Sequence, residues 1–302
     1  MNGGVSSSSS AYSYTGVSSA PSGNLWAQAF RRLRRKRIAV AGFCVFLLIC
    51  LACIMAPWLT KWDYWQINAR NRLSPPSAEH IFGTDNLGRD VFSRLLYGGR
   101  ITLRIALVSA SLAMAAGGLI GLVAGYFGDR ADMIISPVLD ILASVPVILL
   151  ALTIESIFGW GRGYFMYAII LAAIPQFARL VRAAVMDVMG CEYIEAARAL
   201  GVGHTGIILR HVLHNVAPLL ITRFTSGVAE TLLTCTIMGY LSIGVRPPTP
   251  EWGAIVFNAK EYMRVSPIMM VIPCAVIAVC VLSVSLFGDG LRDALDPRQS
   301  GT

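Results

Sequence analysis

The sequence predicts an all-α integral membrane protein with about six transmembrane helices. Three properties of the 302-residue chain lead to this prediction: a mean hydropathy of +0.63, a charged-residue content of only 14%, and a series of apolar segments long enough to cross a bilayer. A chain this apolar has too little polar surface to cover a water-soluble globule, so lipid is its natural solvent.

The apolar segments are spaced along the chain and separated by polar stretches. They cover residues 38–59, 103–126, 133–157, 164–181, 216–243 and 267–287. The first alone reaches roughly 33 Å as an α-helix, whereas a hydrocarbon core is about 30 Å thick. Each segment is expected to be helical because lipid offers the backbone no hydrogen-bond partner. Pro146, Pro175, Pro218 and Pro273 are expected to kink these helices.

A block of basic residues before the first segment predicts the orientation of the chain. The block consists of Arg31, Arg32, Arg34, Arg35, Lys36 and Arg37. Such a block stays in the cytoplasm, and six crossings return the C-terminus to the same side. Its position also indicates an anchor for anionic lipid rather than a nucleic-acid surface.

These features divide the chain into four regions. Residues 1–30 are expected to form a disordered cytoplasmic tail, because residues 1–24 are rich in Ser, Gly and Tyr and carry no charge. Residues 31–100 hold the basic anchor, the first transmembrane helix and an outer loop. Residues 101–290 form a transmembrane core, and 291–302 form a cytoplasmic C-terminal tail.

Within the core, the polar stretch 182–215 separates the fourth and fifth spans, and the predicted topology places it in the cytoplasm. Residues 192–200 are strong helix formers, and Gly201 and Gly203 supply the stop. A second helical stretch is expected over 207–213. A short amphipathic helix of this kind can dock in a groove of a cytoplasmic partner protein and move with it.

Several residues of this stretch suit such docking. Ala196 and Ala197 permit close approach, Glu195 offers a charge, and Gly201 reverses the chain without a Cβ clash. The simpler alternative is that Glu195 and Arg198 form an exposed ion pair three residues apart, worth a few tenths of a kcal/mol. The residues alone leave these two interpretations about equal.

The histidines of this stretch do not predict a metal site. His204, His211 and His214 are close in sequence, but no carboxylate or thiolate lies at a matching spacing. Histidines near helix ends more often contact terminal carbonyl groups.

At this point the residues resemble a known family. Glu195-Ala196-Ala197, Gly201, Leu213 and Asn215 are similar to the "EAA" loop of prokaryotic ATP-binding-cassette (ABC) importer permeases, although His211 stands at a usually apolar position and His214 at that of a proline. Three further segments resemble the C-type subunit of the dipeptide, oligopeptide, glutathione and nickel permease family: 83–94 (GTDNLGRDVFSR), 247–253 (PPTPEWG) and 288–297 (GDGLRDALDP). The likeness runs from about Trp26 to Arg298.

The resemblance implies the type I ABC importer permease fold and a transport function. It implies a non-catalytic subunit in the inner membrane of a prokaryote that passes a small solute, with di- or oligopeptides first and glutathione or a nickel chelate as alternatives. The implied partners are a homologous second permease, two cytoplasmic ABC ATPase subunits, an extracytoplasmic solute-binding protein and membrane lipid, but no nucleic acid. The residues implied to couple to the ATPases are Glu195, Ala196, Ala197, Gly201, Leu213 and Asn215.

ATP chemistry is assigned to the partners. No G-x-x-x-x-G-K-[ST] loop occurs in the sequence, so the chain is not expected to cradle ATP by that route. The chain itself is expected to bind no cofactor, whereas ATP and Mg are used by the partner ATPases.

Ionisable residues within the apolar segments are a second group of candidates. Asp140 and Glu230 are costly at membrane depth unless they face a cavity or a partner helix. Arg179 and Arg223 lie within plausible reach after helix packing. We expect structural ion pairs here in preference to pore residues that contact the solute.

Three further features concern the scaffold and the outer side. Gly117, Gly121 and Gly125 repeat every four residues and predict close packing against another helix. Asp85 is expected to cap a short amphipathic helix over 86–98. The last feature is a stiff outer segment that contains Pro247, Pro248, Pro250 and Trp252. It is interpreted either as part of an outer gate or a contact for a binding protein. The alternative is that Trp252 alone anchors the segment at the membrane interface.

Two functions from other classes compete with an ABC permease. An ion-coupled secondary carrier would hold its own solute and ion sites at mid-membrane, and Asp140 and Glu230 are its best support. No internal repeat is apparent between the halves of the sequence, however. A membrane sensor or scaffold would move no solute.

Overall fold

The computed structural model describes residues 25–160 and 163–295. Over these ranges the chain consists of helices and connecting loops, with one isolated β-bridge between Thr84 and Asp90. The predicted disordered segment 1–24 and the last residues of the C-terminal tail lie outside the described residues. Residues 25–30, assigned above to the tail, are helical, because a run of good helix formers continues through them.

The elements follow one another in a simple order. They are α1 (Leu25–Arg35), α2 (Arg37–Ile54), α3 (Ala56–Leu59), η1 (Ala69–Asn71), α4 (Val91–Phe127), α5 (Asp129–Ser144), α6 (Val147–Phe158), α7 (Phe165–Met189), α8 (Glu192–Ala199), α9 (His204–Gly206), η2 (Ile207–Val212), α10 (Leu213–Tyr240), α11 (Trp252–Ala259), η3 (Lys260–Tyr262) and α12 (Ile268–Leu295).

Five helices of the described ranges are long and apolar enough to cross a membrane. They are α2, α4, α7, the continuous helix His204–Tyr240 and α12. A sixth crossing exists if α5 and α6 together count as one span. The all-α prediction with about six spans is therefore confirmed.

The predicted span 133–157 is a bent pair of helices, and the kink expected at Pro146 is confirmed. The chain bends by 85° between α5 and α6. Pro146 has no N–H to donate, and a residue before proline is driven out of the α region; Val145 accordingly has φ −84° and ψ 119°. Pro175, Pro218 and Pro273, by contrast, lie inside uninterrupted helices.

The predicted helical stretch over 207–213 is confirmed, and it is continuous with the fifth span. It is wound as a π-helix in η2 and runs directly into α10, so the fifth span begins in the polar stretch. The fourth span likewise extends past its predicted end at 181, up to Met189. Polar residues at both helix ends hid these extensions from the hydropathy pattern.

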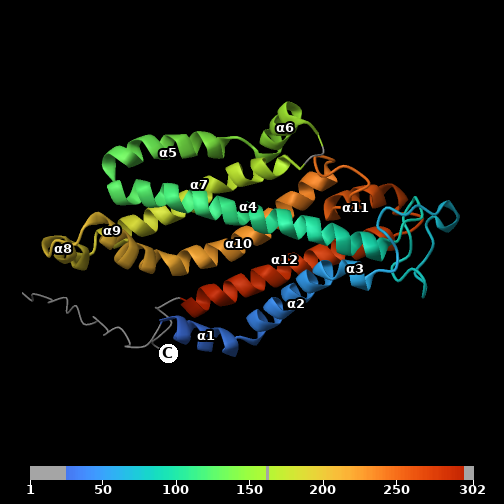
Figure 1. The fold of residues 1–302 in the computed structure, drawn as a ribbon, viewed down its shortest axis with the longest axis horizontal. Coiled ribbons are helices and arrows are strands. Elements are labelled where there is room, and N and C mark those ends of the chain that lie inside the picture. Colours follow the sequence, from blue (N-terminus) through green and yellow to red (C-terminus); the bar gives the residue numbers. More distant parts are fainter. Residues whose placement is uncertain (1–24, 161–162, 296–302) are drawn as a thin grey trace, which may run out of the picture.

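The long helices lie side by side in an elongated bundle (Figure 1). α4 packs along α7, α2 packs along α12, and α10 contacts both pairs. The helices α8 and α9 project at one end, where α1 and the end of α12 also lie, and loop residues 60–90 form the opposite end. Lys36 Nζ pairs with Asp293 Oδ2 at 2.5 Å and fastens the first span to the last.

The glycine repeat of α4 forms a close helix contact. A Cβ atom on Gly117 would lie 2.7 Å from the carbonyl oxygen of Ile174, and one on Gly125 would lie 2.7 Å from that of Arg182. A Cβ on Gly121 would collide with the carbonyl oxygen of Ala178. The predicted close packing is confirmed, and α7 is the partner.

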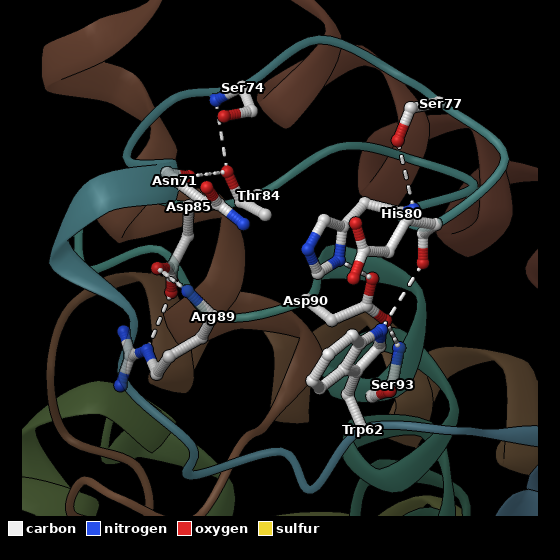
Figure 2. A network of polar contacts seen from close by, with 11 residues as sticks. Trp62, Asn71, Ser74, Ser77, His80, Thr84, Asp85, Arg89, Asp90 and Ser93 are labelled. Carbon is white, nitrogen blue, oxygen red and sulfur yellow. Dashed lines mark hydrogen bonds and ion pairs between the residues drawn. The ribbon is translucent and has the colours of Figure 1, made fainter.

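The predicted helix over 86–98 with Asp85 as its cap is wrong. Asp90 caps α4 instead, accepting a 2.7 Å hydrogen bond from the Ser93 N–H. Asp85 holds the preceding turn, because its carboxylate accepts from the Arg89 N–H at 2.9 Å and pairs with Arg89 Nε at 2.7 Å (Figure 2). Gly88 has φ +74°, so a helix does not run through this turn.

A histidine fastens the outer loop to the start of α4. His80 Nδ1 lies 2.9 Å from Asp90 Oδ1, and the His80 ring stacks on Trp62 with centroids 5.3 Å apart (Figure 2). Asp90 therefore joins the loop to the helix that it caps.

The glycine contact leads to a prediction with a matched control on neighbouring residues. Gly117→Ala should lower the thermal unfolding midpoint, since overpacking costs about 1–3 kcal/mol. Gly118→Ala should leave the midpoint unchanged or raise it, because the nearest atom to its Cβ is Leu220 Cδ2 at 3.9 Å and alanine favours helix over glycine by roughly 0.5–1 kcal/mol. Equal midpoints for both variants would contradict the close contact.

Candidate functional site

The polar stretch between α7 and α10 forms a short helix with a defined stop. α8 ends in a Schellman motif: the Val202 N–H donates to the Ala197 carbonyl at 3.1 Å, and the Gly201 N–H donates to the Arg198 carbonyl at 2.9 Å. Gly201 has φ +81°, which a side chain with a Cβ rarely adopts. The predicted helix and its glycine stop are confirmed.

The two faces of α8 differ sharply. Ile194 is fully buried in a cluster that also contains Val185 of α7 and Val216 of α10. Glu195 and Ala196 are exposed, and the Leu200 side chain at the tip is 85% exposed. The outer face of α8 is thus open, while its inner face is packed on two long helices.

The structure separates the two alanines of the EAA pattern. Ala196 is exposed, but Ala197 is buried. The structure thus leaves Ala196 accessible to a partner, and the role of Ala197 in coupling stays a prediction. The pattern could not distinguish them because residues one position apart point about 100° away from each other on a helix.

The other residues of the pattern lie where α10 begins. Leu213 is partly exposed. Asn215 connects the two helices, because its Nδ2 donates to Tyr193 Oη of α8 at 3.2 Å and to the His211 carbonyl at 2.7 Å. The helix His204–Tyr240 is also tied to α4 by a 2.7 Å hydrogen bond between His204 Nδ1 and Tyr126 Oη.

The ionisable residues at membrane depth form two ion pairs. Arg179 Nη2 donates to Asp140 Oδ1 at 2.9 Å and so joins α7 to α5. Arg223 donates two hydrogen bonds to Glu230 on the same helix, with distances of 2.8 and 2.9 Å. Asp140 pairs with Arg179 and Glu230 with Arg223, and the two pairs remain separate.

These pairs are not enclosed by the chain. The Asp140 side chain is 71% exposed and that of Glu230 is 55% exposed. Arg223 lies ten residues from the start of α10 and Glu230 ten residues from its end, which places both about 15 Å from a helix end. Charged groups at that depth do not face lipid, so this face is turned to water or protein.

A cavity of about 290 Å³ opens on the same face. It lies between α7, α10 and the break between α5 and α6. Its polar lining consists of Gln176, Arg223, Glu230, Thr231 and Thr234. Gln176 was not identified from the sequence, because an uncharged amide inside an apolar segment gives no strong signal.

A third ion pair braces α5 to α7 nearer to α8. Arg182 Nη2 lies 2.5 Å from Asp132 Oδ2, and Ser136 Oγ donates to Asp132 Oδ1 at 2.7 Å. Arg182 is the residue with which the predicted polar stretch begins. It therefore belongs to the helix packing rather than to the exposed part of that stretch.

A buried acid in α6 also escaped the sequence analysis. Glu155 is fully buried, and its Oε1 accepts a 2.9 Å hydrogen bond from the Phe165 N–H at the start of α7. The signal was present, since Glu155 lies in the predicted third span and is as costly there as Asp140.

The outer segment is organised around Trp252, which is 0% exposed and donates from Nε1 to the Leu95 carbonyl at 2.9 Å. The interpretations of Trp252 as a binding-protein contact or an interfacial anchor are therefore wrong, whereas its part in an outer gate stays a prediction. Pro247 lines a separate outer cavity of about 260 Å³, and Pro248 is exposed. Pro250 is buried, so only part of this segment is accessible.

Glu251, next to Trp252, is a buried acid with several partners. It caps α11 by accepting from the N–H groups of Gly253 and Ala254 at 2.9 and 3.0 Å. Thr102 Oγ1 of α4 donates to it at 3.2 Å. Burial raises the pKa of this carboxyl from 4.5 to about 7, against the opposing effect of these hydrogen bonds.

Two known families match most of the chain. The family described as "Binding-protein-dependent transport system inner membrane component" matches residues 117–301, and the "N-terminal TM domain of oligopeptide transport permease C" matches residues 24–76. The chain belongs to this family of ABC importer permeases. Both matches agree with the resemblance seen in the sequence.

Named relatives and a solved structure support the same conclusion. The dipeptide transport system permease protein DppC of Alkalihalophilus pseudofirmus is 38% identical over 273 residues, covering 90% of each chain. The glutathione transport system permease protein GsiD of Pectobacterium atrosepticum is 38% identical, covering 90% of this chain and 91% of that one. The inward-facing MetNI methionine ABC transporter has a similar fold, with a TM-score of 0.55 and 22% identity over 67% of this chain and 96% of that one.

The permease is thus a non-catalytic, multi-pass inner-membrane subunit with a type I ABC importer fold. ATP hydrolysis belongs to separate ATPase subunits, and membership of this family implies partner ATPase and permease subunits. It also decides against the ion-coupled carrier and the sensor or scaffold considered above.

The raised pKa of Glu251 gives a pH-dependent prediction. The folded chain holds this proton at pH values where the unfolded chain has lost it, so the stabilisation is complete below about pH 4.5 and is lost as the pH rises through about 7. Glu251→Gln should therefore gain thermal stability relative to the parent between pH 5 and pH 8, measured on the assembled complex in nanodiscs. A difference in unfolding midpoint that stays constant over this range would contradict the buried protonated carboxyl.

Proposed function

We propose that this permease forms one half of a path for di- and oligopeptides, and that it is driven through α8 by two cytoplasmic ABC ATPase subunits that use ATP and Mg. A homologous second permease would supply the other half of the path. An extracytoplasmic solute-binding protein would deliver the solute. Glutathione or a nickel chelate is the alternative solute within the same family.

The observation that carries this proposal is the attachment of α8 to the helices that line the mid-membrane cavity. The open face of α8 offers Glu195, Ala196 and Leu200 to a partner. Its buried face rests through Ile194 on α7 and α10, and these two helices also line the cavity. A push on α8 therefore reaches the cavity walls through packed side chains.

The energy required is within reach of such a contact. Moving a two-state permease from 1:99 to 99:1 needs roughly 5.5 kcal/mol of differential binding. A pair of ATPases that engages one such segment on each permease can supply this by binding one state better than the other. Ala197 serves this coupling from the buried side of α8, Asn215 ties α8 to the start of α10 through Tyr193, and the exposed Leu213 is offered to the ATPase.

The orientation follows from charge. The basic block precedes the first span, and α1, the end of α12 and α8 share one end of the bundle (Figure 1). This end is cytoplasmic if the basic block obeys the positive-inside rule. Both termini would then be cytoplasmic. The chain would consist of an N-terminal tail, an anchor with an outer loop, a permease core and a C-terminal tail.

The face that carries the ion pairs would meet the second permease. Asp140 and Arg179 are more than 40% exposed on this face, with side-chain values of 71% and 49%. Exposed charges at membrane depth need water or protein around them, which a path between two permeases provides.

A glycine substitution tests the coupling role of α8. Gly201→Val should reduce ATP-driven uptake of peptide by about tenfold in proteoliposomes holding the complete importer, because a β-branched residue at positive φ costs about 1–2 kcal/mol and reorients the tip of α8. Membrane insertion and ATP hydrolysis should persist, so that hydrolysis is uncoupled from uptake.

Gly203→Val is the matched control. Gly203 has φ −67° and no atom within 4 Å of a built Cβ, so valine fits there without strain. Normal uptake by the Gly201→Val importer, or equal loss in both variants, would count against coupling through α8.

Thiol labelling tests the orientation. In a Cys191→Ser background, Ala199→Cys should react with an impermeant maleimide only in inside-out vesicles, and Glu79→Cys only in intact spheroplasts. Both positions are exposed and lie at opposite ends of the bundle. The reverse pattern would overturn the cytoplasmic assignment of α8.

A further inference from the structure

The cavity beside α7 and α10 contains a guanidinium group that is held on three sides. Both oxygens of Glu230 accept from Arg223, and Gln176 Oε1 accepts from Arg223 Nη2. The Arg223 guanidinium also lies over the Phe177 ring, 5.5 Å from its centroid. Arg223 is therefore fixed in place before any solute arrives, and its partner Glu230 is the more exposed of the two.

The charge of the cavity is balanced. Its charged lining residues are one arginine and one glutamate, so their charges sum to zero. A pocket of this kind has no net attraction for a simple anion or cation, but it offers one site for each sign. This favours a solute that carries one carboxylate and one ammonium group.

The spacing of the two residues suits a short peptide. Arg223 and Glu230 are seven residues apart on α10, which places their Cα atoms about 10.5 Å apart along the axis. In the closed pair the two charged groups touch at 2.8 Å. When the pair opens, the groups can separate toward the spacing of their Cα atoms, and an extended di- or tripeptide, at up to about 3.3–3.6 Å per residue, can then reach both. A volume of about 290 Å³ lies at the lower end of small-molecule pockets and is too small for a long chain.

We propose that this cavity is a transient binding station for zwitterionic solutes of the di- and tripeptide class, with the solute carboxylate on Arg223 and its ammonium group on Glu230. This assignment rests on the proposed function, in which the same face lines the path. Arg223 is nearer to α8 than Glu230, so the carboxylate end of the solute leads toward α8.

Exchange of partners makes such a station compatible with transport. A solute that enters opens one ion pair and forms two, and departure restores the original pair. Gln176 continues to hold Arg223 throughout, so the empty site reassembles without reorganising the helix. Binding is then favourable enough for entry and weak enough for release, as a conducting path requires.

The experiment measures protection of a cysteine placed in the cavity. Thr234→Cys is labelled with a small neutral methanethiosulfonate in the complete importer in nanodiscs, without nucleotide or solute-binding protein, and labelling of the native cysteines is subtracted. L-alanyl-L-alanine at about ten times its dissociation constant should slow labelling about tenfold. N-acetyl-alanyl-alanine and alanyl-alanine amide, which lack one of the two charges, should protect much less.

Variants separate charge recognition from simple filling of the cavity. Arg223→Gln and Glu230→Gln should each abolish protection by the dipeptide. Lys36→Gln is the matched control, because it removes an ion pair far from the cavity and should preserve protection. Equal protection by the free and blocked dipeptides in the parent importer would overturn the station, and so would the absence of any protection.

Uptake of alanyl-alanine by the same importer, measured in parallel, distinguishes the two proposals. Uptake without protection overturns the station and leaves the peptide path intact. Protection without uptake supports the station and overturns the peptide path. The absence of both overturns both.

Discussion

The arrangement of this permease depends on the close approach of α4 and α7. Three glycines of α4 lie against backbone carbonyl groups of α7, at a distance that leaves no space for a Cβ atom. This contact fixes the position of α7 from Ile174 to Arg182. Because α7 is held on that side, its other residues, Gln176 and Arg179 among them, are free to face the cavity and the neighbouring α5.

The same helix connects the membrane core to the exposed end of the molecule. α7 leads almost directly into α8, and the side chain of Ile194 returns to pack on it. α10 enters the same cluster through Val216 and carries Arg223 and Glu230 further along. The helix α8 and the polar cavity are therefore attached to the same two helices, so a rigid shift of α7 and α10 moves both.

Sequence signals predicted the structure correctly where a residue determines the geometry of the helix or turn to which it belongs. Gly201 ends α8 because only glycine readily adopts its backbone angle, and the glycine repeat of α4 predicts close packing whatever the partner is. Hydropathy located the spans for the same reason, since lipid selects every residue of a span. The polar ends of α7 and the fifth span fell outside this signal.

The sequence was less informative where two residues could fill the same role, or where tertiary contacts determine the position of a residue. Asp85 and Asp90 are both plausible helix caps, and the turn at Gly88 decides between them. Trp252 reads as a surface aromatic, but the loop carries it into the core beside Leu95. A proline such as Pro146 predicts a break, but the angle of 85° depends on how α6 packs against α7.

The pairing of Arg223 with Glu230 has a consequence for the resting membrane. An unpaired arginine in this cavity would attract small anions from both sides of the membrane and bind them there even without solute. Because Glu230 lies within hydrogen-bond distance of Arg223, it cancels this field. The cavity of the empty permease therefore carries no net charge that would attract inorganic ions out of water.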